Sequence, residues 1–186
     1  MNYYQWTFDP KNDVAWFLGE PCDESGNTVS GWQFMSCRAA ATDQRLIASI
    51  KRPGKRTEIA FGAIDLPYVD REMADMLLRE LGNEVQLVQV GVAGSDDPVW
   101  IVNALHEEPC LDESNSRFTK WEGDSIAARR MAGKYRMVVK LIVDKNKTGG
   151  HDILRPWGWH PALIISERLK LLIEGVGATS SRFILV

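Results

Sequence analysis

The feature that most constrains the fold of this chain is a unit of sequence that occurs twice, 96 residues apart, at residues 66–90 and 163–186. Each copy contains an apolar approach, a helix-capping residue type, an amphipathic helical pattern, a glycine and a short apolar strand. The capping residues are Asp70 and Ser166, both of which favour the start of a helix. Neither copy contains a nucleophile, a metal-ligand spacing or a phosphate loop, so the repeat indicates a scaffold and does not name an activity.

The apolar positions of the two units align under the same offset. The aligned pairs are Val69 with Ile165, Met73 with Leu169, Met76 with Leu172, and Leu77 with Ile173. Because these positions recur at helical spacing, we expect both helices to bury the same face. The sequence therefore predicts an α+β fold, with an antiparallel-rich sheet, few helices and two similar helix–strand units.

The remaining elements are expected in one domain that spans the chain, with a β-rich N-terminal part at residues 1–62 and the rest at 63–186. Weak alternation predicts a strand at residues 32–37. Two apolar runs, at residues 47–50 and 59–61, flank a basic segment and predict a hairpin with a charged tip. No low-complexity segment divides the chain.

The second half is expected to contain strands at residues 99–105 and 135–143, the latter rich in β-branched side chains. Between them, the polar stretch 107–133 is too long for an ordinary loop. It is expected to hold a short strand or a turn of helix, or to serve a function. Residues 144–161 are expected to form the loop that leads into the second repeat unit.

Charge and hydropathy exclude several classes of protein. The formal net charge is −3 and the pI is about 5.7, which argues against nucleic acid as the main partner because phosphate binding needs clustered Lys and Arg. No apolar run approaches the ~20 residues that span a bilayer. The first residues have neither the basic nor the apolar region of a secretion signal. We therefore expect a cytoplasmic protein that does not bind a membrane.

The residue types that carry catalysis are few and scattered. The chain has three cysteines and three histidines, namely Cys22, Cys37, Cys110, His106, His151 and His160. The cysteines share no metal-type spacing and are expected to be small, partly buried hydrophobic residues. The adjacent pair His151 and Asp152 has the chemistry of an acid and a base, but in a strand their side chains would face opposite ways. We expect no catalytic residue, no cofactor and no metal.

Two segments are candidates for recognition of a partner. The first, from His106 to Asp124, has six acidic residues against Arg117 and Lys120, an excess that could steer a basic partner. The acids expected to contact the partner are Glu107, Glu108, Asp112 and Glu113. The alternative interpretation is a solvated acidic loop.

The second candidate segment is the tryptophan loop at residues 155–161. Arg155, Trp157 and Trp159 have the composition of interface anchors, and the flanking prolines stiffen the segment. The alternative is that at least one indole is buried under the adjacent helix, because seven tryptophans in a chain of this length must mostly serve the core.

Three stretches of the sequence carry a resemblance to a known family. They comprise residues 66–72 with 85–88, residues 100–105 with 110–112, and residues 133–137, 155–159 and 163–168. Together they resemble the immunity-protein family numbered eleven in the classification of bacterial polymorphic toxins. The resemblance covers about residues 60–186. It implies a small cytosolic protein that binds and neutralises a toxin encoded beside it, while the chemistry of that toxin does not transfer.

The predicted function is therefore that of a non-enzymatic immunity protein, whose partner is a cognate protein toxin of basic character. One alternative is a small hydrolase or ligand-modifying enzyme that uses His151 and Asp152. Another is a structural or regulatory domain with no toxin partner. A toxin gene next to this one would favour the first interpretation, and a deep polar pocket around His151 would favour the enzyme.

Overall fold

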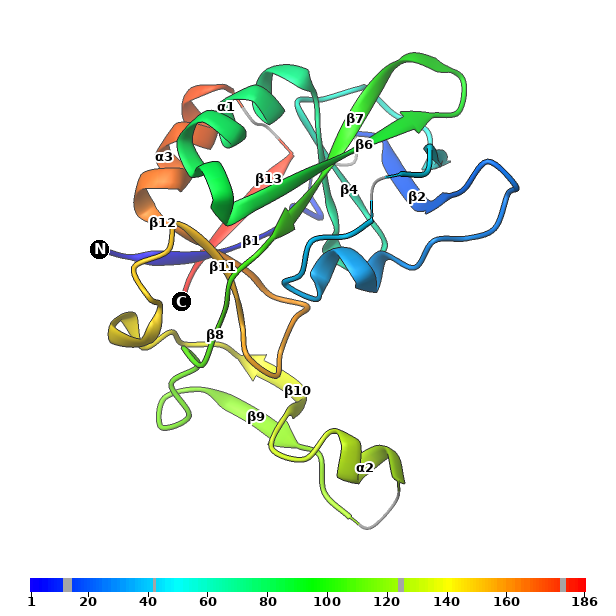
Figure 1. The fold of residues 1–186 in the computed structure, drawn as a ribbon. Helices are drawn as coiled ribbons and strands as arrows, with labels where there is room; N and C mark the ends of the chain where they lie inside the picture. The colour runs from blue at the N-terminus through cyan, green and yellow to red at the C-terminus, as the bar shows by residue number, and fades with distance from the viewer. Residues whose placement is uncertain (12–14, 42, 124–125, 178–179) are drawn as a thin grey trace.

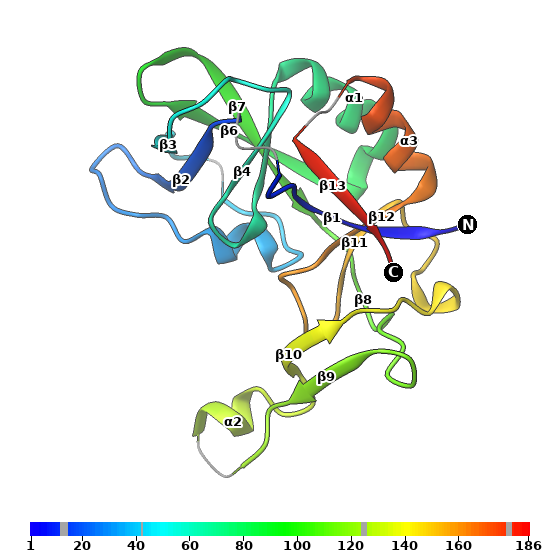
Figure 2. The same cartoon turned by 180° about the vertical axis from the view of Figure 1, so that it is seen from behind.

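The computed structural model describes residues 1–11, 15–41, 43–123, 126–177 and 180–186. Their strands form a closed six-stranded barrel, an open five-stranded sheet and a two-stranded ribbon. The helices α1 and α3 lie side by side, and the ribbon projects from the opposite end of the molecule (Figures 1 and 2). The fold is α+β, as the sequence predicts.

The barrel contains most of the first half of the chain. Its strands, in spatial order, are β2 (Phe17–Cys22), β3 (Leu46–Arg52), β6 (Val85–Val92), β7 (Ser95–Ala104), β5 (Pro67–Val69) and β4 (Ile59–Gly62). Because successive side chains of a strand face opposite sides, every second residue is available to fill the interior. Buried apolar side chains of these strands form one hydrophobic cluster, and the 3₁₀ helix η1 (Gly31–Met35) contributes Phe34 and Met35 to it.

Two predictions for this part are wrong. Residues 31–35 form η1 and not a strand, because Ser30 caps the helix by accepting a hydrogen bond from the Trp32 N–H at 3.4 Å. The strands β3 and β4 exist, but they do not pair as a hairpin. Strand β2 lies between them, antiparallel to β3 and parallel to β4, because the closed barrel requires a strand at that position.

The open sheet contains strands from both ends of the chain. Its order is β13 (Ser181–Leu185), β1 (Tyr3–Phe8), β12 (Leu163–Ser166), β11 (Ile153–Pro156) and β8 (Glu107–Glu108). Strand β11 lies within the segment 144–161 that was predicted to be a loop, so that prediction is wrong. A hairpin joins β11 to β12, which leads into the second repeat unit.

The ribbon consists of β9 (Arg117–Lys120) and β10 (Tyr135–Lys140), with the short helix α2 (Ile126–Arg130) between them in sequence. The polar stretch 107–133 thus holds short strands and a short helix, as predicted. A cluster that includes Tyr3, Cys110 and Ile164 packs between the ribbon side and the open sheet. We call it the lower core.

Each repeat unit is a strand, a helix and a parallel strand, with one antiparallel strand inserted between the two. In the first unit, β7 lies between β5 and β6, and α1 (Arg71–Leu81) connects them. In the second, β1 lies between β12 and β13, and α3 (Glu167–Gly175) connects them. The caps form as predicted: Asp70 accepts from the Met73 N–H at 2.9 Å, and Ser166 accepts from the Leu169 N–H at 3.1 Å.

The strand register shows that the repeat is larger than the sequence indicates. Val88 pairs with Ile101 in the first unit, and Ile184 pairs with Gln5 in the second. The two members of each corresponding position are 96 residues apart, the offset that also relates α1 to α3. The inserted strand β1 is therefore the counterpart of β7. Each of the two units has an inserted strand at the same position and in the same register.

The two units share one hydrophobic core. It contains Met73 and Leu77 of α1, Leu169 and Ile173 of α3, and Trp6 of the inserted strand β1. An ion pair between Arg168 and Glu80, 3.1 Å from Nη1 to Oε2, also joins the helices. The boundary expected at residue 62, between the N-terminal part and the rest of the chain, falls between β4 and β5. These two strands pair with each other in the barrel.

Candidate functional site

Three of the residues predicted to contact a partner line one hollow beside the ribbon. Asp112, Glu113 and Trp157 lie around a cavity of about 360 Å³, together with Tyr135 and Lys147. The Trp157 side chain is 42% exposed. We call this cavity the acidic hollow, because it combines two carboxylates with an accessible indole.

The carboxylates of the acidic hollow already have partners within the chain. The side-chain amide of Asn115 donates to Asp112 at 2.7 Å, and this bond is the main reason that the pKa of Asp112 is lowered. The Lys120 ammonium lies 2.7 Å from Glu113, and the Tyr135 hydroxyl donates to the same carboxylate at 2.7 Å. These two bonds lower the pKa of Glu113, so both acids are ionised but partly neutralised.

Glu107 and Glu108 have partners of their own on strand β8. Glu107 contacts the ring of His160, and Glu108 Oε1 lies 3.5 Å from His151 Nε2. Their side chains are about a third and a quarter exposed. These two acids therefore connect β8 to neighbouring segments of the chain.

Arg155 was predicted to be an interface anchor, and this prediction is wrong. Its side chain is fully buried, on the internal strand β11 of the open sheet. Nη1 donates to the carbonyl oxygen of His160 at 2.6 Å, while Nε and Nη2 have no hydrogen-bond partner among the described residues. Burial lowers the pKa of Arg155 to about 10.

Trp159 lies in a second cavity, on another side of the ribbon. It packs against the lower core, so the indole is partly buried but not under α3. It also lines a cavity of about 590 Å³ whose walls are mostly apolar. We call this cavity the apolar groove; its lining residues are Gln5, Phe8, Phe17, Trp32, Gly62, Ile64, Asp65, Val138, Val139, Leu141, Trp159 and Pro161.

Two exposed apolar side chains that line this groove could not be identified from the sequence. Trp32 and Val139 line it from different segments and are 51% and 54% exposed. Met137, two residues earlier on β10, is 50% exposed. The β-branched run that contains Val139 indicated a strand, but no local signal separated a buried strand from an exposed one. Large apolar side chains gathered on a surface are typical of binding sites.

The pair His151 and Asp152 is not assembled as an acid–base pair. Asp152 accepts hydrogen bonds from the Ser166 hydroxyl and from Arg168, the latter at 2.6 Å from Nη2. Burial raises the pKa of Asp152, but these two bonds outweigh it and leave the pKa lowered. His151 faces Glu84 instead, with 3.4 Å between Nδ1 and Oε1. The contacts on which the hydrolase alternative depends are thus used elsewhere.

Burial keeps two of the three thiols in their protonated form. All three cysteines are free. Burial raises the pKa of Cys110 to about 12 and the pKa of Cys37 to about 11. Since the thiolate is the reactive form, these two residues are unreactive at neutral pH.

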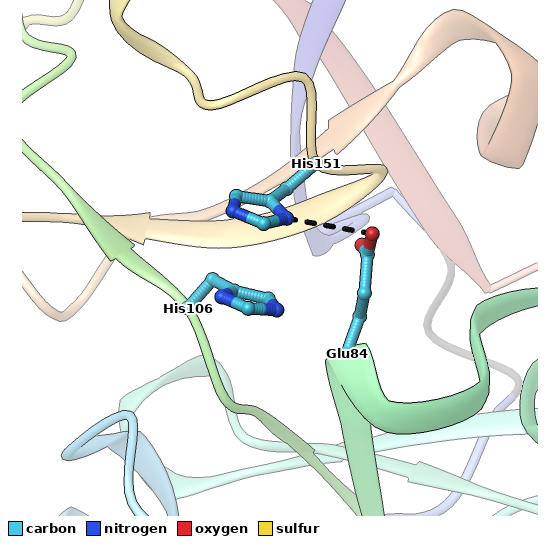
Figure 3. A group of neighbouring side chains, drawn as sticks. All are labelled: Glu84, His106 and His151. Atoms are coloured by element: carbon cyan, nitrogen blue, oxygen red, sulfur yellow. Dashed lines mark hydrogen bonds and ion pairs between the residues drawn. The ribbon is translucent and has the colours of Figure 1, made fainter.

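One group among the described residues has the donors to hold a metal ion. The ligand atoms of Glu84, His106 and His151 all lie within 4.8 Å of one another (Figure 3). The sequence predicted no metal site, because the two histidines are far apart in the chain and have no motif spacing. Parallel pairing of β8 with β11, with Glu107 opposite Arg155, brings their flanking segments together.

No protein-family model matches this chain, and no curated protein matches it either. Within the part of the chain that the structure describes, no helix is both long and apolar enough to cross a membrane. The residues that the structure describes thus form an apolar groove and a separate acidic hollow, each with an exposed tryptophan in its lining.

Proposed function

We propose that this chain is an immunity protein, which binds a cognate protein toxin in the cytoplasm and blocks its active site or its substrate path. The observation that carries the proposal is the exposure of Trp32 and Val139 in the lining of the apolar groove. The resemblance of residues 60–186 to the immunity-protein family numbered eleven is the support from the sequence. The contacts of His151 and Asp152 give no comparable support to a hydrolase.

The shape of the groove suits an inserted apolar side chain of a partner. Trp32 comes from η1 next to the barrel, and Val139 comes from the ribbon, so a partner seated in the groove contacts both halves of the chain. Exposed aromatic residues next to a cavity are the usual anchors of protein interfaces, because they bury much area at low entropic cost.

Charge complementarity supports a toxin that presents basic side chains. A lysine or arginine of the partner can stack on the exposed Trp157 and approach Asp112 or Glu113 in the acidic hollow. Because Lys120 already neutralises part of this charge, the acids are expected to accelerate association more than they strengthen the final complex.

The proposal is tested by co-expression of this chain with the toxin encoded beside its gene. The wild-type chain should restore growth, and Val139→Asp should abolish protection because it places a charge in the groove. A matched control is Leu171→Asp, which changes a side chain that is 60% exposed on α3, away from the groove. The control variant should protect like the wild type, and both variants should keep the wild-type melting temperature.

The two tryptophans of the loop separate an anchor from a core residue. Trp157→Ala should leave the melting temperature unchanged and accelerate dissociation from the toxin at least about tenfold, as expected for a contact of an interface centre. Trp159→Ala should instead lower the melting temperature, because its indole packs against the lower core. Killing that continues in the presence of soluble wild-type chain would contradict the immunity function itself.

A further inference from the structure

Two imidazole rings and one carboxylate meet where the two halves of the chain join. Glu84 ends the 3₁₀ turn η3 (Gly82–Glu84) after α1, His106 follows β7, and His151 precedes β11. Figure 3 shows the carboxylate beside the edges of both rings. All three residues are half-buried. We propose that Glu84, His106 and His151 bind one divalent transition-metal ion of the Zn²⁺ class.

The carboxylate of Glu84 is held in place before any ion binds. Its Oε2 accepts hydrogen bonds from the backbone N–H groups of Asp152 at 2.9 Å and Ile153 at 3.3 Å. Its Oε1 is left facing His151 Nδ1 at 3.4 Å. A carboxylate fixed through one oxygen offers the other as a single, preorganised ligand.

The two nitrogens of His151 have different surroundings. Nδ1 faces Glu84, and Nε2 lies 3.5 Å from Glu108 Oε1. Metal-binding histidines commonly donate the second ring N–H to a carboxylate, which fixes the tautomer and strengthens the metal bond. Glu108 is placed for that supporting role, and an ion bound between Nδ1 and Glu84 Oε1 replaces the contact that these two atoms make without it.

Gly149 shows how closely this arrangement is packed. A Cβ on Gly149 would lie 2.7 Å from His151 Cδ2 and 3.1 Å from Glu108 Oε1, and the residue has a φ of +64°. A side chain at this position would displace both the imidazole and the carboxylate. The turn therefore accommodates the site only because residue 149 is glycine.

His106 supplies the second nitrogen ligand. Its ring stacks on His151, with 3.6 Å between centroids and 10° between planes. The ligand atoms of the three residues lie within 4.8 Å of one another, whereas two ligands of a tetrahedral Zn²⁺ with bonds of about 2.05 Å are roughly 3.4 Å apart, so binding needs only a small movement of the side chains.

Binding of one ion by both histidines requires one ring to rotate. The nitrogen lone pair lies in the plane of each ring, so the lone pairs of two stacked rings run parallel and do not converge on one point. His106 is the ring that can turn, since its side chain makes no hydrogen bond among the residues that the structure describes, whereas His151 is held by Glu84 and Glu108. Nitrogen donors exclude Mg²⁺ and Ca²⁺ as the preferred ions, because those cations select oxygen ligands.

The site is tested by calorimetric titration of the full chain with ZnCl₂ after removal of bound metal by a chelator. The wild type should bind one equivalent. His106→Phe keeps the stacked aromatic ring but removes the lone pair, and it should weaken binding at least about tenfold, a conservative figure because even supporting residues contribute 10–100-fold. His160→Ala is the matched control, because His160 contacts Glu107 and not this cluster, and it should bind like the wild type.

A second readout does not depend on how His106→Phe folds. Co²⁺ added to the wild type should give the visible absorption of a four-coordinate site, and Glu84→Gln should abolish it. Unchanged Zn²⁺ affinity in His106→Phe, equal loss in His160→Ala, or no binding by the wild type would each overturn the proposal. Toxin neutralisation is a separate measurement, so failure here leaves the immunity function standing.

Discussion

The two halves of the molecule have the same strand order but differ in closure. The barrel contains the run β6-β7-β5-β4-β2, and the open sheet contains the corresponding run β13-β1-β12-β11-β8. In the barrel, β3 pairs with both β2 and β6 and closes the circle. In the second half the chain between β8 and β11 forms the ribbon instead, so one strand decides between a barrel and an open sheet.

Closure also decides what the corresponding positions can hold. Strand β4 pairs Ile59 with Val69, and β11 pairs Ile153 with Ile165, so Phe61 and Arg155 occupy corresponding sites two residues further on. Phe61 packs edge-on against Trp6 in the shared core, with 6.4 Å between centroids. At the corresponding site of the open sheet, Arg155 buries a guanidinium that donates to the His160 carbonyl. The barrel half is a packed scaffold, whereas the open half carries the ribbon, the acidic hollow and most of the candidate metal site.

The strongest test of the correspondence is deletion of residues 182–186. The counterpart strand β6 is internal to the barrel, so β13 is expected to be equally necessary although it lies at a sheet edge. Residues 182–185 pair with residues 4–7 of β1, and the Val186 N–H donates to the Tyr3 carbonyl at 3.1 Å. We expect a loss of about 5 kcal/mol or more, comparable with the entire stability of an ordinary domain.

Denaturant unfolding followed by tryptophan fluorescence measures this effect. Leu185→Ala serves as the control, because Leu185 is exposed and the variant keeps the strand backbone. It should unfold near the wild-type midpoint. A truncated chain that unfolds with the wild-type midpoint would show that β13 is not equivalent to β6.

The helices could be predicted from the sequence residue by residue, because their signals are local. Asp70 and Ser166 cap α1 and α3, and the aligned apolar positions face the shared core, with Leu172 only partly buried. The inserted strands could not be predicted in the same way. Pairing of β7 with β5 and of β1 with β12 depends on contacts between distant segments, which no local pattern of residues specifies.

The residues of the candidate site differ in the same way: some could be predicted from local sequence, and others depend on contacts between distant segments. Asp112, Glu113 and Trp157 were predicted from composition, and the structure places them around one hollow. Arg155 had the same composition signal but is buried, because the short strand β11 was not recognised between its glycines and prolines. Trp32 and Val139 line the same groove only after the barrel and the ribbon have formed, so their proximity could not be predicted from the sequence.

Substitution of Arg155 is expected to have the next largest effect on stability. It tests how the two halves differ at one pair of corresponding sites. Arg155→Ala should cost about 2–4 kcal/mol, because it leaves a cavity in the sheet. Arg155→Met fills the same space without a buried charge and is expected to stabilise the chain by about 1–3 kcal/mol. Thermal unfolding of both variants provides the measurement. Equal destabilisation by Ala and Met would mean that the guanidinium makes a favourable interaction that burial alone does not explain.

A smaller effect, dependent on pH, is expected at the start of α3. The backbone N–H of Ser166 donates to the carbonyl of Asp152 at 2.9 Å, as Asp70 does to Glu58 in the first half, but only the second half adds an ionic contact with Arg168. Asp152→Asn should cost about 1 kcal/mol at pH 7, because Arg168 is exposed and water screens the pair.

The sign of the pH dependence follows from the lowered pKa of Asp152 in the folded state. A carboxyl with a lowered folded pKa stabilises the protein above its unfolded pKa of about 3.9, and this stability is lost as the pH falls through the folded value. The difference between wild type and Asp152→Asn should therefore shrink below about pH 4. In an Arg168→Gln background the same substitution should have a smaller effect, and an undiminished one would remove Arg168 from the explanation.

The smallest effect is expected from a circular permutation, although it rearranges the chain most. The Val186 N–H donates to the Tyr3 carbonyl at 3.1 Å, and in the barrel the corresponding residues Val90 and Val99 pair on either side of the turn at Gly94. The ends of β13 and β1 therefore lie where β6 and β7 are joined.

A short glycine linker between residues 186 and 1, with new ends at Gly94, should give a chain that folds with a melting temperature near the wild type, because loop closure costs little and exposed turns tolerate new ends. The same linker with new ends between Met76 and Leu77 should prevent folding, since it interrupts α1 in the shared core. If the Gly94 permutant fails to fold, the two turns are not interchangeable, and the equivalence of the halves is limited to the helices and their pairing register.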